Sequence, residues 1–110
     1  PPPPNHTGPE RRAAPRYRCL RECLVRQEGG ASEVVPFNGM VFNVSLAGVG
    51  LALHYPAPVG AVLTVELLGR GGAPPARARV VRRKQEAFVW FHGCEFLAPL
   101  GEAELRAWLR

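Results

Sequence analysis

Two short stretches carry side chains suited to binding an anionic ligand with a purine edge. Arg12 and Arg16 follow the spacing R-x-x-x-R beside a proline, and Asn43, Ser45 and Gly48 form the pattern N-x-S-x-x-G between apolar runs. Guanidinium forks match phosphate oxygens and the O6/N7 edge of guanine. A turn of Asn, Ser and Gly brings polar groups close to a ligand. Together the stretches predict a site for a phosphate-bearing guanine nucleotide.

The spacing of the two arginines does not by itself decide their local structure. Pro15 disfavours helix at Ala14 and favours an extended segment, in which Arg12 and Arg16 share a face. On a helix the same pair would also share a face, at positions i and i+4. The N-x-S-x-x-G stretch alone would be read most simply as a tight turn, and the arginines are what favour a ligand site.

Length and composition predict one domain, and its positive charge indicates either an anionic partner or GC-rich codon usage. The chain has 110 residues, of which 46% are apolar, and no apolar run approaches the ~20 residues of a membrane span. The net charge is +5, and Lys84 is the only lysine among 14 basic residues. We expect no membrane span and no secretory signal. Two basic clusters contain Arg11, Arg12, Arg16, Arg18 and Arg21, and Arg77, Arg79, Arg82, Arg83 and Lys84.

The residue types weigh against catalysis and against a metal site. The chain contains no Asp, which excludes a Ser-His-Asp set around Ser45 and disfavours a Mg²⁺-dependent phosphotransferase. Cys19, Cys23 and Cys94 could bind Zn²⁺ with a histidine, but each lies in an apolar run where a free Cys acts as a small buried side chain. His92 is expected to be half-buried in a strand. We therefore predict a non-enzymatic protein without a metal, in a reducing cytoplasmic compartment.

The pattern along the chain predicts a small antiparallel barrel. Residues 1–9 are Pro-rich and are expected to form a disordered tail or linker, and residues 10–110 to form the domain, as a whole chain or a fragment of a larger protein. A helical stripe of Leu105, Trp108 and Leu109 follows the strands. Phe88, Trp90 and Phe96 are expected in the core. The expected strands cover residues 17–27, 33–42, 49–54, 59–68, 76–84 and 87–96, before a helix over 101–110.

These motifs, in this order, resemble the bacterial PilZ domains that bind cyclic di-GMP. The arginine pair precedes the barrel, N-x-S-x-x-G follows 27 positions after Arg16, and Gly93 to Phe96 is similar to the closing G-x-x-F strand of the family. The resemblance covers roughly residues 10–110. It implies an all-β fold, namely a six-stranded antiparallel β-barrel with a short C-terminal α-helix.

The resemblance also implies roles for the motif residues. Arg12 and Arg16 would bind phosphate or guanine, and Arg11 would stack on a base, bind a phosphate or remain solvated. Asn43 would accept from guanine, where many relatives have Asp, and Ser45 would offer its hydroxyl. Gly48 would permit close backbone approach or a positive φ. Cyclic di-GMP would bind as a monomer or as an intercalated dimer.

Three functions stay open at this point. The first is a cyclic di-GMP receptor domain that changes the conformation of its N-terminal segment and of a neighbouring domain or protein partner. The second is a PilZ-type protein-interaction adaptor that binds no nucleotide. The third is a basic barrel for single-stranded nucleic acid, which is disfavoured because the aromatic residues needed for stacking are expected in the core.

Overall fold

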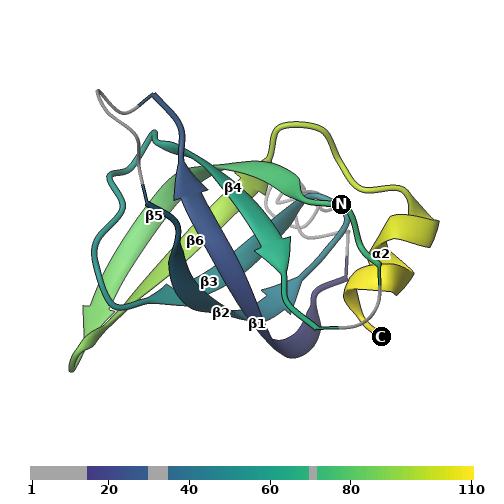
Figure 1. Cartoon of the computed structure of the whole chain (residues 1–110), viewed down its shortest axis with the longest axis horizontal. Helices are drawn as coiled ribbons and strands as arrows, with labels where there is room; N and C mark the ends of the chain where they lie inside the picture. Colours follow the sequence, from purple (N-terminus) through teal and green to yellow (C-terminus); the bar gives the residue numbers. More distant parts are fainter. Residues whose placement is uncertain (1–14, 30–34, 70–71) are drawn as a thin grey trace, which may run out of the picture.

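A computed structural model describes residues 15–29, 35–69 and 72–110 of the chain. Six strands precede a single short helix in this part of the chain, as the sequence predicts (Figure 1). The predicted tail, residues 1–9, lies outside the described residues. The elements are β1 (Tyr17–Gln27), β2 (Phe37–Val44), β3 (Gly48–Leu53), β4 (Val62–Leu67), β5 (Ala76–Glu86), β6 (Val89–Phe96) and α2 (Glu102–Trp108).

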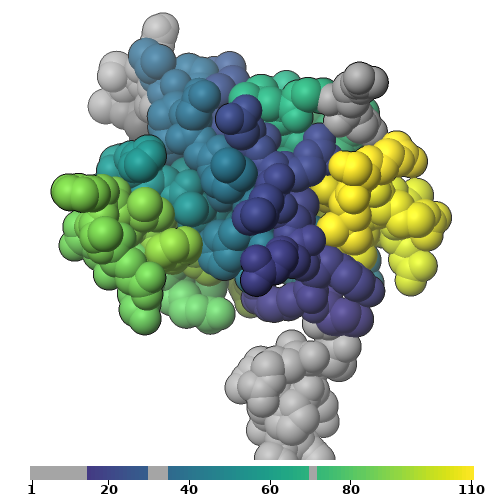
Figure 2. Space-filling view, turned by 90° about the horizontal axis from the view of Figure 1, so that it is seen from below, coloured from purple at the N-terminus to yellow at the C-terminus, as the bar shows by residue number. Residues whose placement is uncertain are grey.

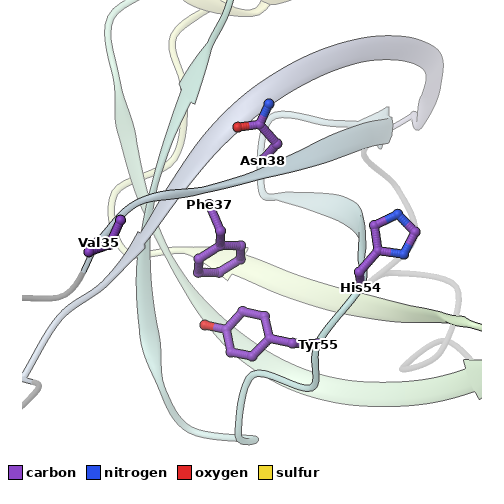
Figure 3. Close-up of a pocket in the computed structure, with 5 residues that line it drawn as sticks. All are labelled: Val35, Phe37, Asn38, His54 and Tyr55. Carbon is purple, nitrogen blue, oxygen red and sulfur yellow. The ribbon is translucent and has the colours of Figure 1, made fainter.

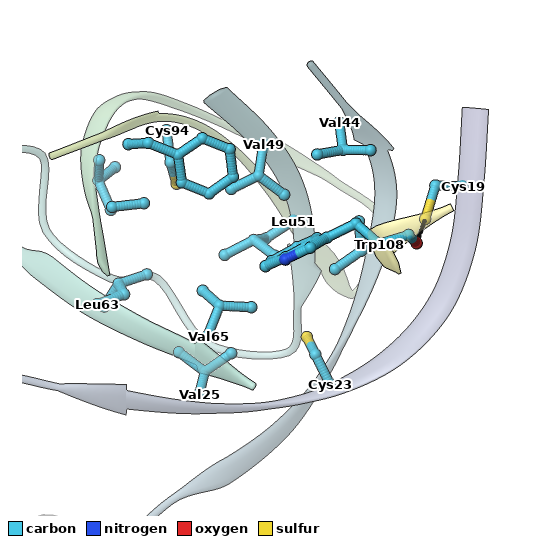
Figure 4. Packing of buried hydrophobic residues seen from close by; sticks show 14 of the residues in the cluster. Cys19, Cys23, Val25, Val44, Val49, Leu51, Leu63, Val65, Cys94 and Trp108 are labelled. Carbon is cyan, nitrogen blue, oxygen red and sulfur yellow. Dashed lines mark hydrogen bonds between the residues drawn. The ribbon is translucent and has the colours of Figure 1, made fainter. Parts of the chain in front are cut away.

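The strands pair antiparallel and close on themselves in the order β1-β2-β3-β6-β5-β4. Alternate residues point inward over most of the strands, and apart from His92 the inward positions are β-branched or otherwise apolar, which is what a filled barrel of this size requires. Val41, Leu51, Leu63, Val65 and Val80 are all essentially inaccessible to solvent, and several of them meet in the centre of the barrel (Figure 4). The predicted six-stranded antiparallel β-barrel is therefore confirmed.

Helix α2 closes one end of the barrel. It has seven residues, too few to be stable alone, and it is held by Trp108, whose side chain is fully buried and meets Phe96 edge-on with ring centroids 5.7 Å apart. Arg21 of β1 donates to the carbonyls of Trp108 and Leu68, at 3.3 Å each. Strand β1 and α2 lie side by side in the space-filling view (Figure 2).

Two expectations about the core have different outcomes. Cys19, Cys23 and Cys94 are buried free cysteines, as the apolar runs around them predict, and burial raises the pKa of Cys23 and of Cys94 to about 12. Phe88, however, was predicted on a core face and is 85% exposed. The reason is that the chain reverses at Ala87, which has a φ of 55°, so residue 88 belongs to the turn between β5 and β6.

His92 on β6 is a fully buried polar residue that binds the loop between β3 and β4. Its Nε2 accepts a hydrogen bond of 3.0 Å from the backbone N–H of Ala57, so the ring must be neutral. Burial lowers the pKa of His92 below its usual 6.5, and the charge of Arg83 acts in the same direction. The carbonyl of Ala57 accepts from Arg83 at 3.2 Å, so the loop is fixed at both backbone groups.

We expect the protein to lose stability as the pH falls below about 6.5. The unfolded chain takes up a proton at His92 before the folded chain does, so the contribution of neutral His92 is complete above that pH and declines below it. The measurement is the free energy of unfolding in urea between neutral and mildly acidic pH. His92→Gln should flatten this decline, whereas His54→Gln should keep it. Equal slopes in all three proteins would contradict the assignment to His92.

Over the described residues, no helix is long and apolar enough to cross a membrane.

Candidate binding groove on the outer face of the barrel

A row of directly paired residues crosses five strands on the outside of the barrel. Arg18 of β1 pairs with Asn43 of β2, Asn43 with Gly50 of β3, Gly50 with Gly93 of β6, and Gly93 with Arg82 of β5. Paired residues in neighbouring strands project to the same face. The flanking residues Leu51, His92 and Cys94 point inward and are buried, so the row lies on the outer face, where Gly50 is itself buried and Asn43 and Gly93 are half-buried.

The middle of this row has no side chains. A Cβ on Gly50 would lie 2.7 Å from the Asn43 Oδ1 and 2.6 Å from the ring of Phe42, so only glycine fits beside them. Gly93 lies beside Gly50 with Arg82 folded over it. The middle of the row is thus a backbone floor without side chains of its own, with the ring of Phe42 over Gly50 and Arg82 over Gly93.

The structure joins the two motifs that the sequence singles out. Arg16, just before β1, donates from Nη1 to the Asn43 Oδ1 over 2.9 Å. This exposed hydrogen bond joins side chains that are 27 positions apart in the sequence. Arg11 and Arg12 lie outside the described residues, so their predicted place in the site stays a prediction.

Ser45 and Gly48 form a closed turn at the edge of the floor. The Ser45 hydroxyl accepts from the N–H groups of Ala47 and Gly48 at 3.1 Å each, and the Ser45 N–H donates to the Gly48 carbonyl at 2.9 Å. Ser45 is buried. The Ser45 hydroxyl therefore stabilises the turn. Its predicted contact with a ligand stays a prediction.

Gly48 is required by close packing of the backbone. Its φ is not in the left-handed region, but a Cβ there would collide with the carbonyl oxygen of Cys94 on β6. The sequence offered two reasons for glycine at position 48, a close backbone approach and a positive φ, and the structure supports the first.

The floor lies in two adjoining hollows that share Arg16, Arg82 and Gly93. One, of about 530 Å³, extends toward the turn and includes Ser45, Gly48 and the carboxylate residue Glu95. The other, of about 250 Å³, extends toward Phe42 and Phe91, whose rings meet edge-on at 5.3 Å. We call the two together the outer groove. Its cations outnumber its single carboxylate, so it favours an anionic ligand.

Arg82 is a groove residue that the sequence analysis did not single out within its basic cluster. The neighbouring arginines of β5 have identified partners: Arg77 forms an ion pair with Glu28 at 2.7 Å, Arg79 donates to the Gly60 carbonyl, and Arg83 to the Ala57 carbonyl. Arg82 has no such bond among the described residues and lies over the floor. A register shift between Val80 and Arg82 turns it to this face, and alternation alone does not show such a shift.

Metal binding finds no support in the described residues, since no three His, Cys or Glu side chains there lie close enough to hold an ion.

The fold and groove define a small closed barrel with a basic groove on its outer face. Residues 10–110 match the family model of the PilZ domain, and the chain therefore belongs to the PilZ domain family. No curated protein matches the chain in sequence.

Two solved structures share the fold. One is the PilZ domain with c-di-GMP of YcgR from Escherichia coli, which matches with a TM-score of 0.67 and 16% identity over 88% of this chain and 86% of that one. The other is the Bacillus subtilis inhibitor of motility, MotI/DgrA, with a TM-score of 0.62 and 15% identity over 89% of this chain and 47% of that one.

We expect Gly48→Ala to destabilise the barrel by about 1–3 kcal/mol, the usual cost of forcing extra volume into a packed site. The added Cβ meets the backbone of β6, which cannot move without disturbing the β3–β6 ladder. Urea unfolding of both proteins gives this difference. Gly93→Ala is the matched control, because the three atoms nearest to its Cβ all belong to the flexible Arg82 side chain, the first of them 3.1 Å away. Similar losses in both variants would contradict the backbone collision.

Proposed function

We propose that this PilZ domain is a non-enzymatic receptor for cyclic di-GMP and that the ligand binds in the outer groove. The observation that carries the proposal is the hydrogen bond from Arg16 to Asn43, because it brings the arginine motif and the N-x-S-x-x-G motif to one site. The domain of YcgR with c-di-GMP, which shares the fold, supports the choice of ligand.

The groove offers the donors and acceptors that this ligand needs. A cyclic dinucleotide carries two phosphates and two guanines, so it needs cations and guanine-reading groups in one place. Arg16 supplies a planar, permanently charged fork for phosphate or for the O6/N7 edge of guanine. The Asn43 amide oxygen can accept from the guanine N1–H or N2–H. Gly50 and Gly93 carry no side chain of their own, so a flat ring can approach the backbone at Gly93 once the Arg82 side chain moves aside.

Arg82 extends the groove beyond the family motifs. It lies across the glycine floor from Asn43, and it lines both hollows. A ligand that lies on the floor would therefore meet a cation on each side. We propose that Arg82 contributes a phosphate contact or stacks on a base, the two arrangements that a guanidinium offers beside a nucleotide.

Isothermal titration with cyclic di-GMP tests the proposal. We expect saturable binding to the wild-type chain and a dissociation constant raised roughly tenfold to a hundredfold in Arg16→Ala, because a hydrogen bond to a charged group contributes about 1.5–3 kcal/mol. Arg82→Ala should weaken binding in the same direction. The stoichiometry distinguishes one bound ligand from two.

Arg26→Ala is the matched control, since Arg26 carries the same charge on β1 but pairs with Thr64, away from the groove. GTP is the ligand control. Equal weakening of binding by Arg26→Ala would show that the loss of net charge, and not the loss of a groove contact, explains the effect of Arg16→Ala. Absence of binding to folded wild-type protein would overturn the receptor proposal and favour the adaptor function.

We further propose that binding changes the conformation of the N-terminal segment. Arg16 lies immediately before β1, so a ligand held by Arg16 and by the predicted Arg12 would fix the segment against the barrel. A neighbouring domain or a protein partner would then sense the change. This is an order–disorder mechanism, in which the ligand adds contacts to only one of two states.

Hydrogen exchange tests this second step separately. We expect saturating cyclic di-GMP to slow amide exchange in peptides covering residues 10–18, because the bound ligand restricts that backbone. Peptides from β4, which takes no part in the groove, are the internal control. Binding by calorimetry with unchanged exchange in residues 10–18 would contradict the conformational step and leave the receptor proposal intact.

A further inference from the structure

The β5–β6 hairpin carries an exposed aromatic side chain at its tip. Phe88 is 85% exposed, and the residues before it in the hairpin, from position 81 onward, are exposed as well. The turn is made at Ala87 with a φ of 55°, although an alanine pays a steric penalty there that a glycine would not. The hairpin reaches out at the end of the molecule opposite α2 (Figures 1 and 2).

A mainly apolar hollow lies at the same end of the barrel. It has a volume of about 420 Å³ and is lined by Val35, Phe37, Asn38, His54 and Tyr55 (Figure 3). The rings of Phe37 and Tyr55 meet edge-on at 4.2 Å, and the Tyr55 hydroxyl donates to the Gln27 side chain, which fixes that wall. A cavity of about 150 Å³ holds a benzene ring, so this hollow has room for a phenylalanine side chain.

The exposed ring and the hollow are neighbours, and His54 connects them. The His54 side chain lines the hollow, and its Nδ1 lies 3.4 Å from the backbone oxygen of Phe88. The Phe88 ring itself is exposed and does not line the hollow of its own chain. A projection and a recess side by side on one face are self-complementary under a two-fold rotation, which is how homodimer interfaces are usually built.

The cationic side chains near the hairpin tip already have partners within the chain, which favours a docking partner of low net charge over an anionic one. Lys84 forms an ion pair with Glu86 at 3.3 Å. The Arg83 guanidinium donates to the Ala57 carbonyl and lies 5.0 Å from the centre of the Trp90 ring. Within this surface the cations nearest Phe88 are thus already engaged, and two such surfaces can approach without strong repulsion. The Lys84–Glu86 pairs of two copies can also alternate across a two-fold axis.

We propose that Phe88 of one copy of this chain inserts into the hollow of a second copy, and that a two-fold axis repeats the contact. An aromatic side chain buries about 150–250 Å² on insertion, and each dimer contains two such contacts. The buried area therefore stays below about 1,200 Å², the range of weak and transient complexes. The expected dimer is weak, and it forms at high local concentration. This inference does not depend on nucleotide binding.

Sedimentation velocity of the ligand-free chain tests the dimer. We expect the average mass to rise with protein concentration between about 1 µM and about 1 mM, the range of weak dissociation constants. Phe88→Ser should lower the association constant by roughly a hundredfold, because two buried rings are lost per dimer. Val59→Ser is the matched control, since Val59 is also exposed, at 59%, but lies outside the hollow and the hairpin. Unchanged thermal unfolding confirms that both variants fold.

Disulfide trapping identifies the contact itself. Phe88→Cys and Asn38→Cys are prepared as separate proteins, mixed and oxidised, so a bond between positions 88 and 38 can form only between chains. Asn38 is an exposed residue of the hollow, and the three native cysteines are buried. We expect the 88–38 cross-link in preference to a link from Val59→Cys to Asn38→Cys.

Two outcomes overturn the proposal. One is a monomer at every concentration with no 88–38 cross-link above the level of the control pair. The other is a monomer that binds vesicles of anionic phospholipid and loses that binding in Phe88→Ser, which would assign the tip to a lipid surface.

Discussion

Because the six strands close on themselves, the inside of the barrel must be filled with side chains, and polar groups are left with the outer face. Val41, Leu51 and Val80 fill the interior together with Trp108, which enters from α2. The two glycines of the outer groove alternate with residues whose side chains point into the core. Gly50 lies between the buried Val49 and Leu51, and Gly93 lies between the buried His92 and Cys94. The core and the groove are thus two faces of the same strands.

Irregularities in pairing decide which polar side chains reach the groove. Register shifts occur in β1 between Arg18 and Arg21, in the β2–β3 pair between Val41 and Asn43, and in β5 between Val80 and Arg82. A one-residue shift moves every later side chain to the opposite face. All three shifts flank the outer groove, as expected for bulges that aim side chains at a ligand. The proposed receptor function therefore depends on local departures from regular alternation.

The same irregularities explain what the sequence could and could not predict. Strand number, the terminal helix and the buried cysteines follow from periodicity and composition. The resemblance to PilZ domains predicts Arg16 and Asn43 in one site, but not the hydrogen bond between them. The position of Arg82 depends on a bulge for which its own strand has no glycine or proline signal. The position of Phe88 depends on a tight reversal at an alanine, a residue that does not normally mark such a turn.

The choice of Asn rather than Asp at position 43 bears on how the groove would exchange its internal contact for a ligand. The exposed hydrogen bond from Arg16 to the neutral Asn43 amide has a charge on one partner only. A bond from the same guanidinium to a phosphate has a charge on both partners and can be bidentate, so it is the stronger of the two. An Asp at this position would hold Arg16 by a charge-assisted bond of comparable strength. With Asn43, Arg16 is positioned at the groove yet is easily drawn to an anion, which is what a receptor of the proposed kind requires.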